Sequence, residues 1–160
     1  MNIFLLDLNP VECAKMHGNR HVVKMILETC QLLCTVWLMT TPDASFIPYK
    51  KTHANHPCSK WARASQANYV WLCELGRELC KEYTFRYGKT HKCEAIILCL
   101  SDKIPNIPAE GWTPPAQAMP DKYKNAADPV DAYREYYRHE KTHLHVWKRR
   151  DVPEWLLASP

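Results

Sequence analysis

The residues best suited to chemistry lie in one short segment, His17-Gly18-Asn19-Arg20-His21-Val22-Val23-Lys24. On a continuous helix, His17, His21 and Lys24 share one face, and apolar side chains take the opposite face. Arg20 lies beside them. Cationic side chains bind phosphate, and imidazole groups transfer protons. The segment therefore predicts a phosphate-binding or proton-transfer site on a helix, although a solvated amphipathic face has the same pattern.

His17 and His21 are four residues apart, a spacing that also suits a metal ion. No carboxylate lies in the same turn to complete a set of ligands, and the chain has no Cys-x-x-Cys pair. A phosphate loop, a dinucleotide fingerprint and a Gly-x-Ser-x-Gly elbow are missing as well. We therefore expect neither a metal nor another cofactor.

Other segments place cations beside aromatic side chains, as proteins that bind single strands or flipped bases do. They are a connection that leads into a helix start at Pro57, the helix end at 82–92, and the basic C-terminal segment. Ordinary capped connections and helix ends share these features. The residues expected to contact nucleic acid, together with Gln117 of the Pro-rich loop, are His17, Lys50, His53, His56, Trp61, Arg63, Arg86, Lys89, His91, Arg134 and Lys148.

The composition is that of one globular domain with a sizeable core. The chain has 160 residues, of which 46% are hydrophobic and 24% charged, and its formal net charge of +4 suits a polyanionic partner without proving one. Most of the eight cysteines fall on apolar helix faces, which predicts small buried side chains in a reducing compartment. No signal peptide and no apolar run of about 20 residues is evident. We expect a cytoplasmic protein without a membrane or an obligate protein partner.

The pattern of apolar residues predicts an all-α fold, as one domain over 1–160. Residues 3–8 form a strand or extended arm, and Asn9-Pro10 starts a helix that Gly18-Asn19 breaks or bends. Further helices are expected over 20–39, from Pro57 to about Arg86 and after Asp128. A helix is also favoured over 91–100, where a short strand is the alternative. A long Pro-rich loop at about 102–128 precedes a basic, aromatic segment at 129–160.

The arm, the cationic helix, the second long helix and the basic aromatic C-terminal segment together resemble the pyrimidine-dimer DNA glycosylases, the phage endonuclease V type. The resemblance covers much of the chain. The chain is also similar to uncharacterised phage proteins that are given that family's name. The resemblance implies a small, all-helical, metal-independent DNA repair enzyme. The resemblance further implies that an N-terminal α-amine attacks the sugar of a damaged nucleotide to form a Schiff base. A helix-borne Glu flanked by Arg side chains stabilises that intermediate, and β-elimination then cuts the strand.

On this resemblance, the Arg-Glu-x-x-Arg cluster of the family falls on Arg20-His21-Val22-Val23-Lys24. His21 then stands where the family has Glu, and a His lacks the fixed negative charge that stabilises a developing cation. Asn2 is bulky, so Met1 is expected to stay and to offer its own amine.

We therefore expect a glycosylase or lyase-like enzyme that acts on damaged or modified bases in DNA, with His21, Lys24, Arg20 and Met1 as catalytic residues. Two alternatives stay open at this point. One is an enzyme that modifies nucleotides or DNA bases in the same cationic pocket. The other is a DNA-binding protein without catalytic activity.

Overall fold

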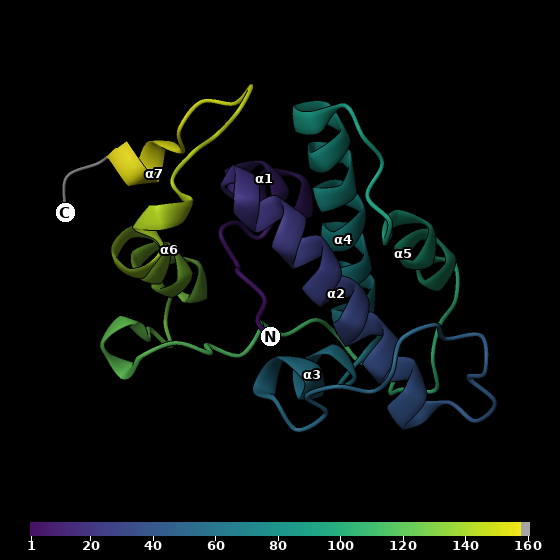
Figure 1. Cartoon of the computed structure of the whole chain (residues 1–160). Coiled ribbons are helices and arrows are strands. Elements are labelled where there is room, and N and C mark those ends of the chain that lie inside the picture. The colour runs from purple at the N-terminus through teal and green to yellow at the C-terminus, as the bar shows by residue number, and fades with distance from the viewer. Residues whose placement is uncertain (158–160) are drawn as a thin grey trace.

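The computed structural model describes residues 1–157, and it is built from helices (Figure 1). Among these residues there is no strand, so the expected all-α fold is confirmed. The α-helices are α1 (Pro10–Met16), α2 (Asn19–Thr40), α3 (Pro57–Ala62), α4 (Gln66–Tyr87), α5 (Glu94–Ser101), α6 (Pro129–Glu140) and α7 (Glu154–Leu157). Two short 3-10 helices span Asp121–Tyr123 and Thr142–Leu144.

The two longest helices, α2 and α4, pack against each other and hold α1 and α5 beside them. Gly76 of α4 permits a close approach, because a Cβ atom there would lie 3.0 Å from Thr29 Cγ2 of α2 and 3.2 Å from Ile97 Cγ2 of α5. The apolar stripe predicted for α2 is buried in this core. In Figure 1, α6 and α7 stand apart from this group, on the other side of the N-terminal arm.

Local capping signals set several helix ends. Asn9 caps α1 through its side chain, which accepts a hydrogen bond from Val11 N. Asp128 caps α6 in the same way, accepting from Asp131 N at 3.0 Å. Gly88 ends α4 with a left-handed φ of 66°, a conformation that glycine adopts without strain. The helix starts at Asn9 and Asp128 were predicted from sequence and are confirmed.

Two predicted helices are interrupted. The helix expected from Pro57 to Arg86 is wrong as a single element, since α3 ends at Ala62 and Ser65 starts α4 by accepting a hydrogen bond from Asn68 N. The continuous helix that was expected to carry His17, His21 and Lys24 on one face is also broken. Because α1 ends at Met16 and α2 begins at Asn19, His17 does not lie on α2.

The N-terminal arm threads through the middle of the molecule (Figure 1). Its residues Ile3, Phe4, Leu5 and Leu6 are buried in the core, although they form no strand. Arg134 of α6 donates to Leu6 O at 2.8 Å, and Trp71 of α4 donates to Leu8 O at 3.0 Å. The arm is thus held from both sides, and this fixes the position of the chain's first residues.

Helix α2 is apolar and long enough to cross a membrane by length and composition. Its most apolar window has a mean hydropathy of 1.5, and 61% of that window is buried inside the protein. This is the expected character of a central core helix, and it corrects the expectation that no segment approaches the length and apolarity of a membrane span.

All eight cysteines are free thiols, and all except Cys99 are buried. Burial raises the pKa of several of them, to about 12 for Cys13 and Cys73 and about 11 for Cys58. These thiols stay protonated and act as small core side chains, as the sequence predicted.

Gly18, between α1 and α2, permits a close backbone contact with the segment at Leu144. A Cβ atom there would lie 1.8 Å from the carbonyl oxygen of Leu144, which is backbone and has little freedom to move. We expect Gly18→Ala to lower the free energy of unfolding by about 1–3 kcal/mol, because the segment at Leu144 must shift. Urea unfolding measures this, with Gly111→Ala as the control, since a Cβ atom at Gly111 meets nothing within 4 Å. Equal stability of the two variants would contradict the prediction.

Candidate active site

A cleft of about 260 Å³ opens where the N-terminal arm meets α2 and α6. It brings together groups that are distant in sequence and of complementary chemistry: an amine, a carboxylate, two imidazoles and two lysines. The cleft is lined by Met1, Asn2, Phe4, His21, Lys24, Glu28, Tyr136, Lys141, His143 and Leu144. Of the predicted catalytic residues, Met1, His21 and Lys24 lie here, while Arg20 is exposed one turn before Lys24 on α2.

The centre of the cleft is an ion pair between the Met1 α-amine and Glu28. The amine nitrogen lies 3.1 Å from Glu28 Oε1, and the two side chains are only 4% and 12% exposed. An amine becomes a nucleophile when it loses a proton, and a carboxylate at this distance can accept that proton. The arrangement is therefore suited to covalent catalysis by an amine.

Asn2 fixes the direction of the chain at this point. Its side-chain nitrogen donates to Ala118 O at 2.9 Å, and its Oδ1 accepts from Ile3 N at 2.7 Å. Because both ends of the amide are held, Met1 leaves the core in one direction, toward Glu28. Ala118 belongs to the loop between α5 and α6, so the Pro-rich loop contributes to the position of the amine.

The cleft is positively charged overall. Lys24 and Lys141 line it together with the Met1 amine, and Glu28 is the carboxylate that opposes them. Such an excess of positive charge attracts phosphate groups and raises the local concentration of a polyanion. Among the described residues, no group of three His, Cys, Asp or Glu side chains is placed to hold a metal ion.

One wall of the cleft is aromatic. Phe4 and Tyr136 are nearly parallel, with an interplanar angle of 10° and ring centroids 5.9 Å apart. The Lys141 ammonium lies 5.8 Å from the centroid of Phe4 and 5.1 Å from that of Tyr136. A cation held over aromatic rings offers both charge and a flat surface, which a sugar phosphate and its base can use together.

His17 and His21 are buried rather than cationic. His17 is fully buried, and its Nδ1 lies 2.8 Å from Cys13 O. Burial lowers the pKa of His17 to about 4 and holds the pKa of His21 well below its usual value. Both rings are therefore neutral at pH 7. The cationic surface at this end of α2 consists of Arg20 and Lys24, and His17 does not face the cleft.

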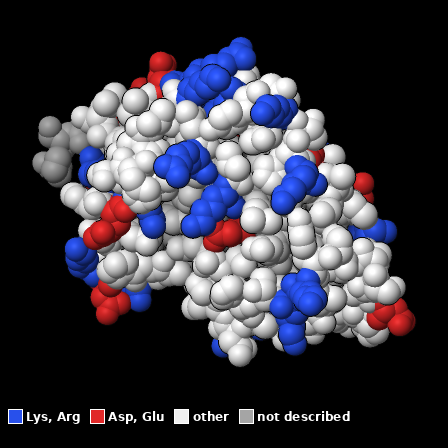
Figure 2. Space-filling view, viewed as in Figure 1, with Lys and Arg blue, Asp and Glu red and all other residues white. Residues whose placement is uncertain are grey.

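The segment 146–148 lies beside the first turn of α2. Asn19 N donates to Val146 O at 2.8 Å, and Asn19 Oδ1 accepts from Lys148 N at 2.8 Å. These bonds bring the exposed side chains of Arg20 and Lys148 to one end of α2. Figure 2 shows Lys and Arg side chains over the centre and top of this face, with acidic side chains mainly toward its margins.

Several predicted nucleic-acid contacts lie in the interior. Trp61 is 7% exposed and packs against Trp71, while its Nε1 donates to Thr113 O. His91 is buried and accepts a hydrogen bond from Cys93 N. These two residues were expected at a binding surface, but the core uses them because their rings fill space between helices.

Two further candidates have their polar groups engaged within the protein. The side-chain nitrogen of Gln117 donates to Asn125 O at 2.7 Å, and its side-chain oxygen accepts from Asn125 N at 2.7 Å. Arg134 donates to Leu6 O and pairs with Asp7. Both side chains hold the chain together, and their expected contacts with a base or a phosphate stay predictions.

The remaining candidates outside the cleft lie on the surface or at its edge. Lys50, His53 and Lys89 are exposed, and Arg63 is half-buried and donates to Ser59 Oγ. His56 caps α3, and its pKa is lowered by burial and then by the positive charge of the N-terminal amine. Within this group, His56 is therefore the residue whose pKa responds to a charge in the cleft, that of the Met1 amine.

Arg86 is a buried structural cation. It is 2% exposed and pairs with Glu82 at 2.9 Å. Its remaining nitrogens donate to the carbonyl oxygens of His17 and Lys15 and to Asn19 Oδ1. Arg86 thus satisfies the backbone where α1 ends and α2 begins, and its donors are engaged within the protein rather than at the surface where nucleic acid was expected to bind.

We expect Arg86→Met to lower the free energy of unfolding by about 3–5 kcal/mol, because the change leaves Glu82 short of a partner and two carbonyls unsatisfied. Urea unfolding followed by tryptophan fluorescence measures the loss. Arg77→Met, on the exposed side of α4, is the control. A stable Arg86→Met protein with weaker DNA binding would contradict this assignment.

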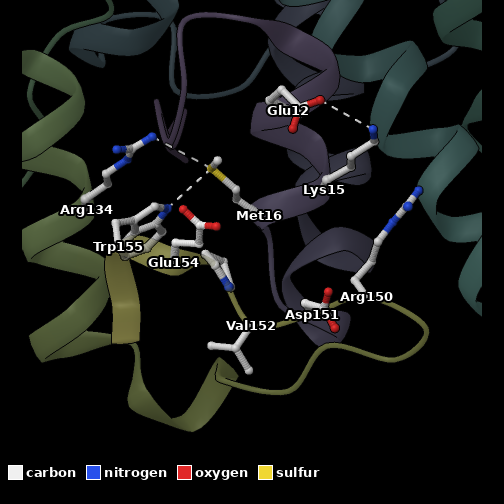
Figure 3. Close-up of a pocket in the computed structure, with 10 residues that line it drawn as sticks. Glu12, Lys15, Met16, Arg134, Arg150, Asp151, Val152, Glu154 and Trp155 are labelled. Carbon is white, nitrogen blue, oxygen red and sulfur yellow. Dashed lines mark hydrogen bonds and ion pairs between the residues drawn. The ribbon is translucent and has the colours of Figure 1, made fainter. Parts of the chain in front are cut away.

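A larger groove of about 480 Å³ lies between α1, α6 and the segment 150–155 (Figure 3). Its cations are already paired: Lys15 with Glu12, Arg134 with Asp7, and Arg150 with Glu82. Met16 lies at its centre, where Trp155 Nε1 donates to its sulfur at 3.3 Å. The amine and carboxylate of this groove, Lys15 and Glu12, have side chains that are 37% and 50% exposed, whereas the α-amine pair in the smaller cleft is buried.

Glu28 is the residue that sequence reasoning missed. No carboxylate lies between His17 and Lys24, and Glu28 follows Lys24 by one turn of α2. One signal was available, because Glu28 is the only charged residue between Lys24 and Asp43, within an otherwise uncharged core helix. A buried charge of this kind requires a partner.

Comparison with known protein families gives one match. A family model described as pyrimidine dimer DNA glycosylase matches residues 1–95, more than half of the chain. The matched region includes Met1, His21, Lys24 and Glu28, whereas the cleft residues of α6 and beyond lie outside it. Comparisons with curated proteins and with solved structures give no match.

Proposed function

Because the chain belongs to the pyrimidine dimer DNA glycosylase family, we propose that it attacks damaged nucleotides in DNA with the α-amine of Met1. The family makes the protein a DNA-acting glycosylase of DNA repair. The observation that supports the finer proposal is the buried pair of the Met1 amine and Glu28 Oε1, 3.1 Å apart in a basic cleft. The proposed site of action is the cytoplasm.

In the proposed reaction, Glu28 takes a proton from the Met1 ammonium, and the free amine attacks C1′ of the deoxyribose. The bond from C1′ to the base breaks, and the base leaves with the bonding electron pair. The nitrogen then loses a proton and the sugar ring opens, which gives a Schiff base between Met1 and C1′. β-Elimination from this intermediate would cut the strand and make the protein a lyase as well.

Glu28 takes the part that the resemblance assigned to the position of His21. A carboxylate supplies the fixed negative charge that stabilises a positively charged Schiff base, and a neutral imidazole does not. Lys24 precedes Glu28 by one turn on α2, so the two lie on one helix face. In this proposal Lys24 and Arg20 bind the phosphates on either side of the nucleotide.

Borohydride trapping tests the proposal. Borohydride reduces a Schiff base to a stable amine, so the wild-type chain with a duplex that contains one abasic site should give a covalent adduct, and peptide mapping should place it on Met1. UV-irradiated DNA tests base removal in parallel. No adduct with either DNA would remove the proposal. Binding of free nucleotides with turnover would then favour a nucleotide-modifying enzyme, and salt-sensitive binding without turnover would favour a DNA-binding protein.

We expect Arg20→Ala and Lys148→Ala each to reduce the salt dependence of DNA binding. A phosphate contact contributes about 0.9 to the slope of log K against log salt concentration, so each variant should lose about that amount. Fluorescence anisotropy at several salt concentrations measures the slope. Lys81→Ala is the control, since Lys81 is exposed and paired with Glu78 on α4. The same slope for all three variants would place the phosphate path elsewhere.

A further inference from the structure

Tyr137 of α6 lies behind the cleft and is bonded to both sides of the break between α1 and α2. Its hydroxyl oxygen accepts from Gly18 N at 2.9 Å and lies 3.1 Å from Nδ1 of His21. A backbone N–H can only donate, so the contact with Gly18 uses a lone pair of the phenol. The phenol hydrogen remains, and the Nδ1 atom of His21 is the acceptor that the structure offers it.

This geometry selects one tautomer of His21. If Tyr137 donates to Nδ1, the ring proton sits on Nε2; the phenol oxygen, its hydrogen and Nδ1 are then all used, which leaves Nε2–H for a ligand or solvent. In the other tautomer, Nδ1–H would donate to the phenol oxygen and leave a buried O–H without an acceptor. An unsatisfied buried donor costs about 1–3 kcal/mol, which is enough to fix the first arrangement. Burial raises the pKa of Tyr137, so the phenol keeps its hydrogen.

The ring of His21 is also kept neutral. Burial lowers its pKa most, and the charges of His17, Lys141, Lys24 and His143 lower it further. His21 is the third residue of α2, where the positive end of the helix dipole opposes an added proton. Tyr137 bonds the ring from α6, and the largest influences on its pKa are burial and these basic groups.

The Nε2 atom of His21 is available to a ligand. Among the described residues it has no hydrogen-bond partner, yet it is not sealed in the interior as Nε2 of His17 is. His21 lines the same cleft as Met1 and Glu28. The residue therefore presents an N–H donor that carries no charge in the cleft that holds the amine and the carboxylate.

We infer that His21 is the neutral hydrogen-bond donor that polarises the C1′ aldehyde oxygen of a ring-opened abasic site, where Met1 attacks without displacing a base, and that Tyr137 is the residue that positions His21. The inference rests on the proposed function and adds a role for each side chain. As the Met1 nitrogen bonds to C1′, the electrons of the C1′=O double bond move to the oxygen, where Nε2–H stabilises them. A proton passes from nitrogen to this oxygen through Glu28, and loss of water completes the Schiff base.

A neutral donor suits this step better than an imidazolium. A charged His21 would repel the Met1 ammonium and compete with it for Glu28. A neutral imidazole that polarises a carbonyl beside a carboxylate base is an established arrangement in enzymes, with its pKa lowered by a helix N-terminus. His21 has the same location, since it lies in the first turn of α2.

Two measurements test the inference. Nitrogen-15 NMR of histidine side chains should show His21 protonated on Nε2 alone at pH 7, and mixed tautomers in Tyr137→Phe. Borohydride trapping on abasic duplex DNA should be about tenfold slower in Tyr137→Phe, and slower still in His21→Ala. His21→Gln should restore part of the rate, since its amide also donates. Tyr69→Phe removes another buried phenol with two hydrogen bonds, away from the cleft, and should trap at the wild-type rate.

Trapping by the wild-type protein together with a proton on Nδ1 would overturn the role of His21 alone. An unchanged trapping rate in a Tyr137→Phe protein whose His21 tautomer has changed would also overturn that role. If the wild-type protein forms no adduct, the proposed function fails and the catalytic role of His21 fails with it. The NMR result still decides the tautomer in that case.

Discussion

Glu28→Gln should slow Schiff-base formation by about 10²–10⁴-fold, because the change removes both the acceptor for the amine proton and the negative charge beside the intermediate. Gln has nearly the same volume as Glu, so the core around α2 should not repack. Single-turnover borohydride trapping on abasic duplex DNA measures the rate. DNA affinity should stay the same or rise slightly, since the change removes a negative charge from a basic cleft.

Glu12→Gln is the matched control for this prediction. Glu12 is also a helical carboxylate paired with a cation, Lys15, but it lies on α1 outside the cleft. Its variant should trap at the wild-type rate. A Glu28→Gln protein within about threefold of the wild-type rate would show that another group accepts the proton, and His56, whose pKa responds to the N-terminal charge, would be the next candidate.

A single Gly added before Met1 should abolish trapping almost completely. The new α-amine would lie one residue before the present one, and consecutive Cα atoms are about 3.8 Å apart. It would therefore lie beyond the hydrogen-bond distance that now joins the Met1 nitrogen and Glu28. The former amine would become an amide, which has no nucleophilic lone pair. Because well-oriented reacting groups contribute large rate factors, we expect a loss of at least about 10²-fold.

The control for the extension is a Gly added after Pro160, which leaves the amine untouched. Intact mass of each protein shows which residue is first, and thermal unfolding shows whether the arm still packs. An extended protein that forms adducts at the wild-type rate would contradict the proposal for Met1. Lys24, the nearest lysine on α2 in the cleft, would then be the residue to map.

The sequence predicted some of the structural features behind these expectations and missed others. Helices α1, α2, α5 and α6 followed from apolar spacing and caps, because those signals act within a few residues. The break between α3 and α4 was missed. Ser65 caps α4, but the side chains around it continue a helical pattern, and the backbone bond from Gln66 N to Pro108 O comes from a distant loop.

The structure distributes the predicted site residues for a related reason, and their roles stay predictions. Lys24 and Met1 line the cleft, and a helix face and a chain end can be recognised locally. His17 and Arg86 carry polar groups that suggest a surface, yet the structure buries both at the α1–α2 break. A sequence pattern cannot distinguish an exposed cation from one that satisfies buried carbonyls, since partners such as Lys15 O lie far away in the chain.

By itself, the sequence determined an all-α chain with a basic helix, a family resemblance and a set of candidate cations. Only the tertiary structure decided which of them meet. The arm must pass between α2 and α6 before the Met1 amine reaches Glu28, and α6 must pack behind it before Tyr137 reaches His21. Long-range packing of this kind depends on how buried surfaces fit together, and no local spacing of residues records that fit.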